Sequence, residues 1–416
     1  MIYKFPTPLD SARWLIILIL VALMFSPAIT NLAELILVIT ILFSNELRKR
    51  VIGACRQPIV IGAIVFYIII TVGVLYSVGG YKEALSMWVG WRKILLLPLA
   101  IALFDDAEWK LKLTIILIVS ASIFCVLSYI GVATNLYFPV PEHALGITLR
   151  NHATQGIIFA VAAFSAAVLL ISTPKLPNFM RLILAAASLL FIINIAFITI
   201  GRSGYIVLIV CSLSIVIGLL ISTRQIKVKS IIVGIISLTI LSATLMLAPS
   251  SHQRIVQAFS EANNYQHATQ ITSIGVRMYF WENTLNMIAK KPLFGYGTGA
   301  FETAYQNEVS NQSGIAATIT SDPHNQFLKV AAEHGLVGFI AFMAFLACSL
   351  KQKPSAPYRM LGLGVLAAWM ATSLANSHFS TFSEGTFIYI WLGAMMANEK
   401  VDDVHTKREI KNYIEH

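Results

Sequence analysis

The stretch PIVIGAIVFYIIITVGVLY, residues 58–76, contains no charged side chain. A run of this length matches the roughly 20 residues that an α-helix needs to cross the hydrocarbon core of a bilayer. Its apolar residues follow one another without the regular polar alternation of strands in a membrane β-barrel. We therefore expect residues 58–76 to form one transmembrane helix.

Eleven similar runs lie elsewhere in the chain, and together they decide the fold class. Hydrophobic residues make up 57% of the 416 residues and charged residues only 12%, against about 25% charged residues in soluble domains. A soluble enzyme and a disordered chain are excluded by these values. The sequence predicts an all-α polytopic membrane protein with about twelve transmembrane helices. The runs span about residues 14–28, 31–44, 58–76, 85–104, 113–133, 153–172, 182–200, 203–222, 230–248, 326–349, 360–376 and 385–398.

The basic residues predict how this bundle is oriented. With twelve spans, twenty of the thirty lysines and arginines fall on the side of the two termini, and ten fall on the other side in longer loops. Positive charge is enriched on the cytoplasmic side of membrane proteins, so both termini are expected in the cytoplasm. The net charge of +10 then needs no nucleic-acid partner. The first run is read as an uncleaved span, because no small-x-small cleavage motif follows it.

The layout divides the chain into four parts. Residues 1–248 would hold transmembrane helices 1–9, residues 249–325 a long outward loop, residues 326–398 helices 10–12, and residues 399–416 a cytoplasmic tail. Within the loop, an amphipathic helix is expected at about residues 274–291, on the membrane surface. Its apolar stripe would be Ile274, Met278, Trp281, Leu285 and Ile288.

Two arginines on the outward side are the first candidates for function. Arg202 lies in the short turn Ile200-Gly201-Arg202-Ser203-Gly204 between two apolar runs, and Arg277 lies on the loop helix. An arginine at a membrane boundary needs an anion or a path to the lipid headgroups. The two readings are therefore an anion site and simple interfacial anchoring.

The third candidate is His324, in the segment Ser321-Asp322-Pro323-His324-Asn325. Pro323 suits the first turn of a helix and Asp322 suits its cap, which would present His324 at the outer mouth of a span. Imidazole is well suited to accept a proton near neutral pH. Further along, Glu333 and His334 are expected to form a buried structural pair.

Weaker candidates lie at the outer ends of other spans. Arg150 and His152 precede the run at 153–172, and Arg92 and Lys93 lie in the run at 85–104, where they could hold an anion. Glu34 could pair with one of these basic residues. A glycine-rich segment such as residues 295–299 can expose backbone N–H groups to phosphate, but a simple loop is the favoured interpretation.

The acidic residues argue against a metal site. Asp322 is the one aspartate on the outward side, and the chain contains no D-x-D, no H-E-x-x-H and no P-loop motif. Because clustered carboxylates are absent, a phosphate or diphosphate would have to be neutralised by arginines. We expect no metal and no cofactor.

These features together resemble the bacterial O-antigen ligase family. The resemblance rests on Arg202 at a span end, Arg277 on a loop helix, and the D-P-H-N-x-x-L-x-x-x-x-E-x-G-x-x-G segment from Asp322 to Gly338. The family includes the lipopolysaccharide O-antigen ligase, O-antigen polymerases and protein O-oligosaccharyltransferases. The fold is implied to be that of membrane-embedded glycosyltransferases that use lipid-linked sugars.

The resemblance implies transfer of O-antigen polysaccharide from undecaprenyl diphosphate to the lipid A–core oligosaccharide. The site would face the periplasm of the bacterial inner membrane, and the lipid bilayer would surround the chain. Arg202 and Arg277 match the family's essential arginines and would hold the diphosphate. His324 matches its essential histidine and would activate the acceptor hydroxyl. Arg92, Lys93, Arg150, His152, Asp322 and Asn325 are expected to contribute to substrate binding.

Two alternatives stay open at the level of the sequence. An O-antigen polymerase would perform the same chemistry with a growing glycan as acceptor. A transporter or flippase of lipid-linked oligosaccharide belongs to a different class, and it predicts polar residues at mid-membrane in broken helices. The gathering of polar residues at one face of this chain favours the glycosyltransferase.

Overall fold

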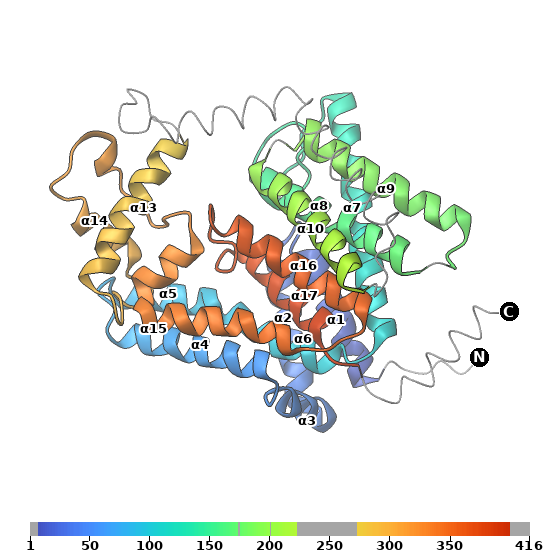
Figure 1. Cartoon of the computed structure of the whole chain (residues 1–416), viewed down its shortest axis with the longest axis horizontal. Coiled ribbons are helices and arrows are strands. Elements are labelled where there is room, and N and C mark those ends of the chain that lie inside the picture. The colour runs from blue at the N-terminus through green and yellow to red at the C-terminus, as the bar shows by residue number, and fades with distance from the viewer. Residues whose placement is uncertain (1–6, 174, 200, 223–272, 400–416) are drawn as a thin grey trace.

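The computed structural model describes residues 7–173, 175–199, 201–222 and 273–399. Within these ranges the chain is helical and contains no strand, which confirms the all-α fold class (Figure 1). The α-helices are α1 (Pro8–Ala22), α2 (Pro27–Phe43), α3 (Asn45–Ala54), α4 (Pro58–Leu75), α5 (Tyr81–Trp91), α6 (Leu96–Leu103), α7 (Ala107–Thr134), α8 (His152–Ser172), α9 (Asn178–Phe197), α10 (Arg202–Ser222), α13 (Ser273–Lys290), α14 (Phe301–Glu308), α15 (Gln326–Cys348), α16 (Ala356–Thr372) and α17 (Phe382–Met396). Short 3-10 turns are η1 (Arg92–Leu95), η3 (Gly314–Ala317) and η4 (Ser349–Lys351).

The described helices make a polytopic membrane protein. Seven of them, with α5, η1 and α6 taken as one, are long and apolar enough to cross a membrane, or eight if the bent pair α2–α3 counts as one span. Helices α1, α16 and α17 also coincide with predicted runs but have only 15, 17 and 15 residues. The predicted run at 230–248 lies outside the described residues. The number twelve therefore stays a prediction.

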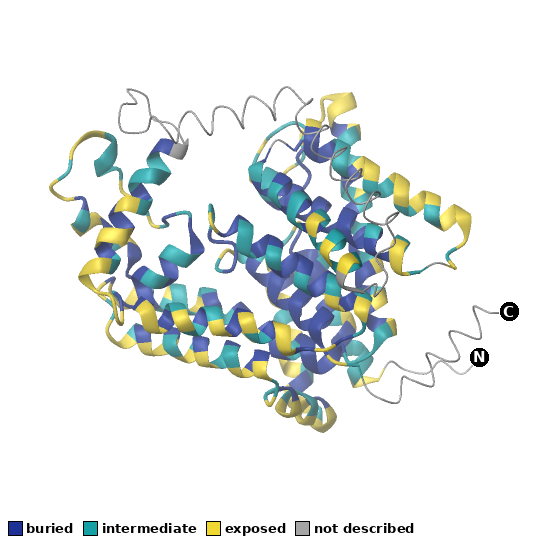
Figure 2. Cartoon of the chain, in the orientation of Figure 1, coloured by how far each residue is buried: buried dark blue, intermediate teal, exposed yellow. Residues whose placement is uncertain are grey.

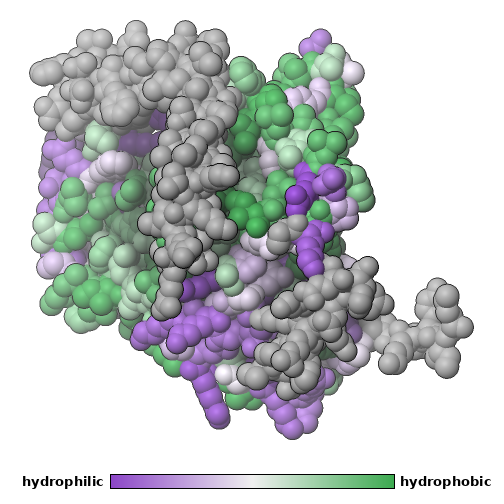
Figure 3. Space-filling model, turned by 45° about the vertical axis from the view of Figure 1, so that its right-hand side comes forward, coloured by the Kyte–Doolittle hydropathy of each residue, from purple (hydrophilic) through white to green (hydrophobic). Residues whose placement is uncertain are grey.

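Helix α17 is the centre of the bundle. Thirteen of its 15 residues are buried, and it packs against α6 and α16, while α4 and α15 lie side by side along one flank (Figures 1 and 2). The outer helices keep apolar side chains on the surface, for example Leu42 of α2 at 58% and Leu182 of α9 at 70% exposed. Figure 3 shows broad hydrophobic areas on one face, above a hydrophilic area at its lower end. Exposed apolar helix faces of this extent suit contact with lipid.

Polar side chains join the helices at two opposite ends of the bundle. At one end, Arg13 and Arg50 bind the two oxygens of Asp105 at 3.2 and 2.8 Å, and Lys110 binds Glu399 at 3.0 Å. We call this the opposite end, because the candidate site described below lies at the other end of the bundle. These contacts bring together chain segments that the layout assigns to one side of the membrane. Which side each end faces stays a prediction.

The other end, which we call the site end, joins the starts of α8, α10, α15 and α17. There the hydroxyl of Thr154 donates to Glu384, and the amide of Asn376 donates to Ser203 at 3.3 Å. All of these residues belong to turns or first helical turns. The site end is therefore held by hydrogen bonds between elements that are far apart in sequence.

Helix α15 is broken at Gly335, and the glycine-rich segment fills the break. Gly335 has φ 62° and ψ −163°, a conformation that glycine adopts without a Cβ clash. The N–H groups of Tyr296 and Gly297 donate to the carbonyls of Ala332 and Glu333 at 3.0 and 2.8 Å. The segment thus satisfies helix carbonyls that the break would otherwise leave unpaired.

The same segment also contacts α4. The N–H of Thr298 donates to the carbonyl of Gly73 at 3.0 Å, and its hydroxyl donates to the carbonyl of Ile70. Because these donors are used inside the protein, the phosphate-binding reading of residues 295–299 is not supported. The structure agrees with the favoured interpretation, a loop, which packs between two helices.

Helix α13 coincides with the predicted amphipathic helix, but its buried face is different. Phe280, Asn283, Thr284 and Met287 are buried against the rest of the protein. Of the predicted apolar stripe, Leu285 is 55% exposed. The sequence pattern identified a stripe that the protein leaves partly uncovered, because α14 and α15 pack on the adjacent face. Its contact with a membrane surface stays a prediction.

Candidate functional site

Two arginines from different helices lie near each other without a carboxylate partner. Arg202 is the first residue of α10 and Arg277 lies in the second turn of α13, and both are half-buried. Neither guanidinium forms an ion pair or hydrogen bond with another described residue. Burial lowers the pKa of Arg277, the positive charge of Arg202 lowers it further, and Asp322 raises it. Two unpaired cations this close create a site that favours an anion.

His324 lies on the third element of the same site, directly before α15. Its ring stacks on the ring of Phe280 of α13, with centroids 6.2 Å apart and planes 23° apart. Its ring nitrogens form no hydrogen bond with the described residues. Burial lowers the pKa of His324, and the positive charges of Arg277 and Lys329 lower it further, while Asp322 raises it. The imidazole is therefore neutral at pH 7 and has a nitrogen free to accept a proton.

Asp322 fixes the conformation of this segment. Its Oδ1 accepts hydrogen bonds from the backbone N–H of His324 and from the hydroxyl of Ser377, both at 2.7 Å. Its Oδ2 pairs with the ammonium of Lys329 at 2.9 Å. These partners outweigh burial and hold the pKa of Asp322 below its usual value. With both oxygens occupied, Asp322 positions the loop, and a direct contact with substrate would have to displace one of these partners.

The start of α15 corrects one detail of the sequence interpretation. The helix begins at Gln326, and the cap is Asn325, whose Oδ1 accepts from the N–H groups of Phe327 and Leu328 at 3.0 and 3.1 Å. The expectation that Asp322 caps the helix is wrong. His324 has φ 53°, a left-handed conformation that interrupts the helix before Asn325.

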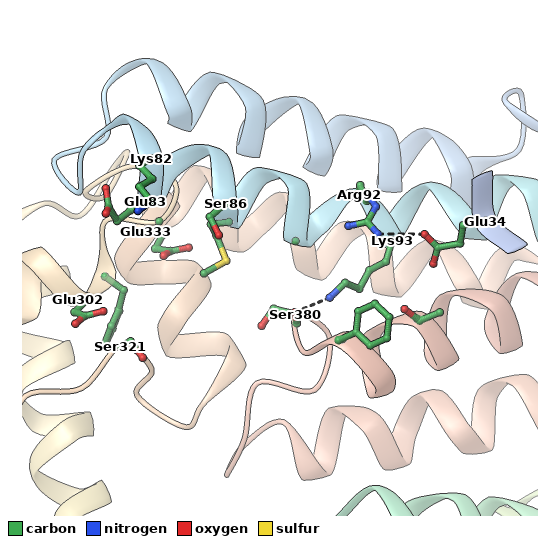
Figure 4. A pocket seen from close by; sticks show the side chains of 16 residues that line it. Glu34, Lys82, Glu83, Ser86, Arg92, Lys93, Glu302, Ser321, Glu333 and Ser380 are labelled. Carbon is green, nitrogen blue, oxygen red and sulfur yellow. Dashed lines mark hydrogen bonds and ion pairs between the residues drawn. The ribbon is translucent and has the colours of Figure 1, made fainter. Parts of the chain in front are cut away.

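Arg92 and Lys93 lie at the site end but have partners there (Figure 4). Arg92 pairs with Glu34 at 3.3 Å, as the sequence suggested. Lys93 donates to the carbonyls of Ser380 and Thr381, both at 2.8 Å. Lys93 therefore ties η1 to the turn before α17, and it has less capacity for an anion than an unpaired lysine.

Arg150 and His152 lie beside the turn that carries Arg202. His152 begins α8 and pairs through Nδ1 with Glu142 at 2.8 Å. Its ring packs against Gly201, where an added Cβ would come within 2.9 Å of the ring. Arg150 lies over the ring of Phe382, 5.7 Å from its centroid. His152, the first residue of α8, thus borders the turn of Arg202, while Arg150, two residues earlier, contacts the start of α17.

Three residues that contact this site were not among the candidates from sequence. Phe280 supports the His324 ring, while Ser377 and Lys329 bind Asp322. Lys329 is one of the ten basic residues that the layout places on the outward side, yet it is buried. Its position seven residues after Asp322 gave no usable signal, because the helix begins only at Gln326. Phe280 and Ser377 carried no signal, because their contacts depend on how distant elements pack.

A comparison with known protein families covers the residues of this site. Residues 186–343, less than half of the chain, match the family model described as O-antigen ligase. The resemblance seen in the sequence is confirmed. The matched segment includes Arg202, Arg277 and His324, which the structure brings to one place.

Relatives extend the similarity over more of the chain. An uncharacterized protein of Haemophilus influenzae is 25% identical over 342 residues, which cover 80% of this chain and 82% of that one. Proteins named "putative polysaccharide ligase" in Rickettsia conorii and Rickettsia felis are 25% and 27% identical. They align with 41% and 30% of this chain and with 36% and 30% of their own lengths. These similarities support a function like that of an O-antigen ligase in a multi-pass membrane protein.

Proposed function

We propose that this protein transfers a polysaccharide from undecaprenyl diphosphate to the lipid A–core oligosaccharide. The reaction would take place at the periplasmic face of the bacterial inner membrane. The observation that carries the proposal is the pair of unpartnered arginines, Arg202 and Arg277, beside the neutral ring of His324. The family match over residues 186–343 supports the same chemistry.

In the proposed mechanism, His324 accepts the proton of the acceptor hydroxyl as that oxygen attacks the anomeric carbon of the donor sugar. The new glycosidic C–O bond forms while the bond between the anomeric carbon and the phosphate oxygen breaks. The diphosphate leaves with the bonding electron pair, and the guanidiniums of Arg202 and Arg277 stabilise its charge. Asp322 acts through His324 by fixing the backbone of the segment.

The arginines would take the role that a divalent cation has in many diphosphate-dependent transferases. In the part of the chain that the structure describes, no group of three or more histidine, cysteine, aspartate or glutamate residues could hold a metal ion. The two guanidiniums offer planar, bidentate hydrogen bonding to phosphate oxygens. We propose that the reaction runs without metal.

The proposal is tested with purified full-length protein, undecaprenyl-diphosphate-linked O-antigen and lipid A–core. We expect the core to acquire long O-antigen chains, which gel electrophoresis resolves as a ladder or a high-mass band. Elongation of the lipid-linked glycan without attachment to the core would contradict the ligase and indicate a polymerase. Movement of the donor across a vesicle membrane without any transfer would indicate a flippase.

A further inference from the structure

A second feature of the site end is a cavity of about 500 Å³ (Figure 4). Its walls come from α2, α5, η1, the start of α14, the middle of α15 and the start of α17. Ser321, three residues before His324, forms part of the wall. The volume lies in the range of small-molecule binding sites, about 300–1,000 Å³. A ligand in this cavity would therefore lie beside the proposed reaction centre.

The charges of the cavity do not suit a phosphate. Its lining contains four glutamates, at 34, 83, 302 and 333, and three basic residues, at 82, 92 and 93. Arg92 is paired with Glu34, and the ammonium of Lys93 is bound to two carbonyls. Little positive charge is left for an anion, in contrast to the site of Arg202 and Arg277. Nor do the described acidic residues group in a way that could hold a metal ion.

One carboxylate oxygen of Glu333, in the cavity wall, has no hydrogen-bond donor beside it. The side chain is 1% exposed, and backbone N–H groups of Gly299 and Phe301 bind its carboxylate. Its Oε1, however, has no hydrogen-bond partner among the described residues. A buried carboxylate oxygen without a partner costs free energy, and native proteins seldom leave such a group unpaired. The geometry calls for a ligand that donates a hydrogen bond here.

Two aromatic side chains add apolar surface to the cavity lining. Phe301 and Phe382 line it together with Ser86, Ser380 and the carboxylates. A lining that combines apolar rings with a few polar groups is typical of sites for neutral small molecules. A sugar ring offers an apolar face for packing and several hydroxyl groups that donate hydrogen bonds. It therefore matches both the rings and the unpartnered oxygen of Glu333.

We propose that this cavity binds sugar residues of a glycan substrate, with Glu333 accepting a hydrogen bond from a sugar hydroxyl. The proposal rests on the proposed function for the identity of the glycan, which is either the acceptor core or the donor polysaccharide. Glu333 would then be a specificity-determining residue. Arg202, Arg277 and His324 would perform the transfer.

The test measures protection of an engineered cysteine. Ser86→Cys places a thiol in the cavity wall, and Ser310→Cys in the exposed turn after α14 serves as the control. Both changes are made after Cys55, Cys125, Cys211 and Cys348 are replaced by serine. A bulky water-soluble maleimide reports the labelling rate of the full-length protein. The probes are core oligosaccharide freed from lipid A, undecaprenyl-diphosphate-linked O-antigen, and undecaprenyl diphosphate without sugar.

We expect one of the two glycan probes to slow labelling of Ser86→Cys about tenfold at ten times its Kd, and Ser310→Cys to be unaffected. The glycan that protects identifies the source of the sugar. Adding Glu333→Gln should raise the Kd of the protecting glycan roughly ten- to a hundredfold and so remove most of the protection, because one carboxylate oxygen is replaced by an NH₂ group that cannot accept a hydrogen bond. Glu302→Gln is the matched control, because Glu302 lines the same cavity with an exposed side chain.

Protection by undecaprenyl diphosphate alone, or by none of the probes, would overturn the proposal. So would full protection in the Glu333→Gln variant. Failure of the proposed function would be seen in a different experiment, the transfer assay. The unmodified protein would then transfer no glycan, whether or not a glycan protects Ser86→Cys from labelling.

Discussion

The two ends of the bundle both hold a pair of arginines, but only one pair has an acidic partner. At the opposite end, Arg13 and Arg50 share the carboxylate of Asp105, at 3.2 and 2.8 Å. At the site end, Arg202 and Arg277 influence each other electrostatically and have no carboxylate in ion-pair contact among the described residues. The same residue type is thus satisfied by the protein at one end and left unsatisfied at the other.

This difference separates a structural role from a binding role. A partly buried cation costs free energy unless an anion compensates it. At the opposite end that compensation is internal, and it ties α1 and α3 to the turn between α6 and α7. At the site end the compensation must come from outside the chain. The contrast therefore predicts that changes at the site end reduce transfer, whereas changes at the opposite end reduce stability.

Replacement of His324 should have the largest effect. General-base catalysis typically contributes 10²–10⁴-fold, so His324→Ala should reduce the transfer rate by about that factor. Asp322 and Lys329 remain paired in this variant, and we expect the protein to insert and melt normally. A transfer assay with purified protein, together with a melting curve, checks both expectations. A loss below tenfold would contradict the assignment of His324 as the base.

Replacement of the site-end arginines should have the next largest effect. Arg202→Lys keeps the charge but loses the planar fork, and Arg277→Ala removes one guanidinium. Each change should reduce transfer about ten- to a hundredfold, since a hydrogen bond to a charged group contributes about 1.5–3 kcal/mol. Arg50→Lys at the opposite end is the matched control and should transfer at the normal rate. Equal activity of Arg202→Lys and the control would mean that Arg202 is only an interfacial anchor.

The pH dependence of the transfer rate tests the role of His324 at the site end. The charged form of His324 is disfavoured in the folded protein, so its pKa lies below 6.5. The neutral ring is the active form, and transfer should therefore be constant near neutral pH and fall as the pH drops through that lowered pKa. Below it, the rate should decrease about tenfold per pH unit. A rate profile from pH 4.5 to 8 checks this, and a midpoint above 6.5 would be inconsistent with the assignment.

Changes at the opposite end should affect stability rather than transfer. Asp105→Asn leaves Arg13 and Arg50 without their shared carboxylate, and we expect it to destabilise the protein by about 1–3 kcal/mol. The transfer rate per folded molecule should stay normal. Thermal melting in detergent and a transfer assay measure the two effects separately. If Asp105→Asn abolished transfer in folded protein, the division between the two ends would be wrong.

The smallest expected effect is that of a chelator. Because arginines rather than a metal neutralise the diphosphate in the proposed mechanism, excess EDTA should leave the transfer rate unchanged. Loss of activity that Mg²⁺ or Mn²⁺ restores would show that a metal takes part. The measurement needs only the purified protein and its two substrates.

Much of the fold was predictable because lipid imposes a simple rule on sequence. A long apolar run must become a helix, since backbone groups have no other partners in hydrocarbon. Residues 58–76 illustrate this, with α4 at Pro58–Leu75. The break of α15 at Gly335 was not predicted, because it depends on the loop at 292–298 inserting its own hydrogen-bonding groups. Such tertiary compensation leaves no periodic signal in the sequence.

The candidate site was predictable where a charged residue stood out against an apolar background. Arg202, Arg277 and His324 carried that contrast, and the structure places them near one another. The contacts that orient them could not be predicted. Ser377 and Phe280 are ordinary residues whose importance comes from packing between α13, α15 and the turn before α17. The sequence predicted Asp322 as the cap of α15, but the cap is Asn325, and Asp322 instead pairs with Lys329.

The central claim is that the arginines bind the donor while His324 acts in the transfer step. The most direct measurement determines donor affinity and transfer rate side by side in His324→Gln and Arg202→Lys. We predict that His324→Gln binds undecaprenyl-diphosphate-linked O-antigen normally but transfers at least about a hundredfold more slowly, because glutamine cannot accept the proton. Arg202→Lys should show weakened donor binding as well. Near-normal turnover in His324→Gln, or normal donor binding and transfer in Arg202→Lys, would contradict the account.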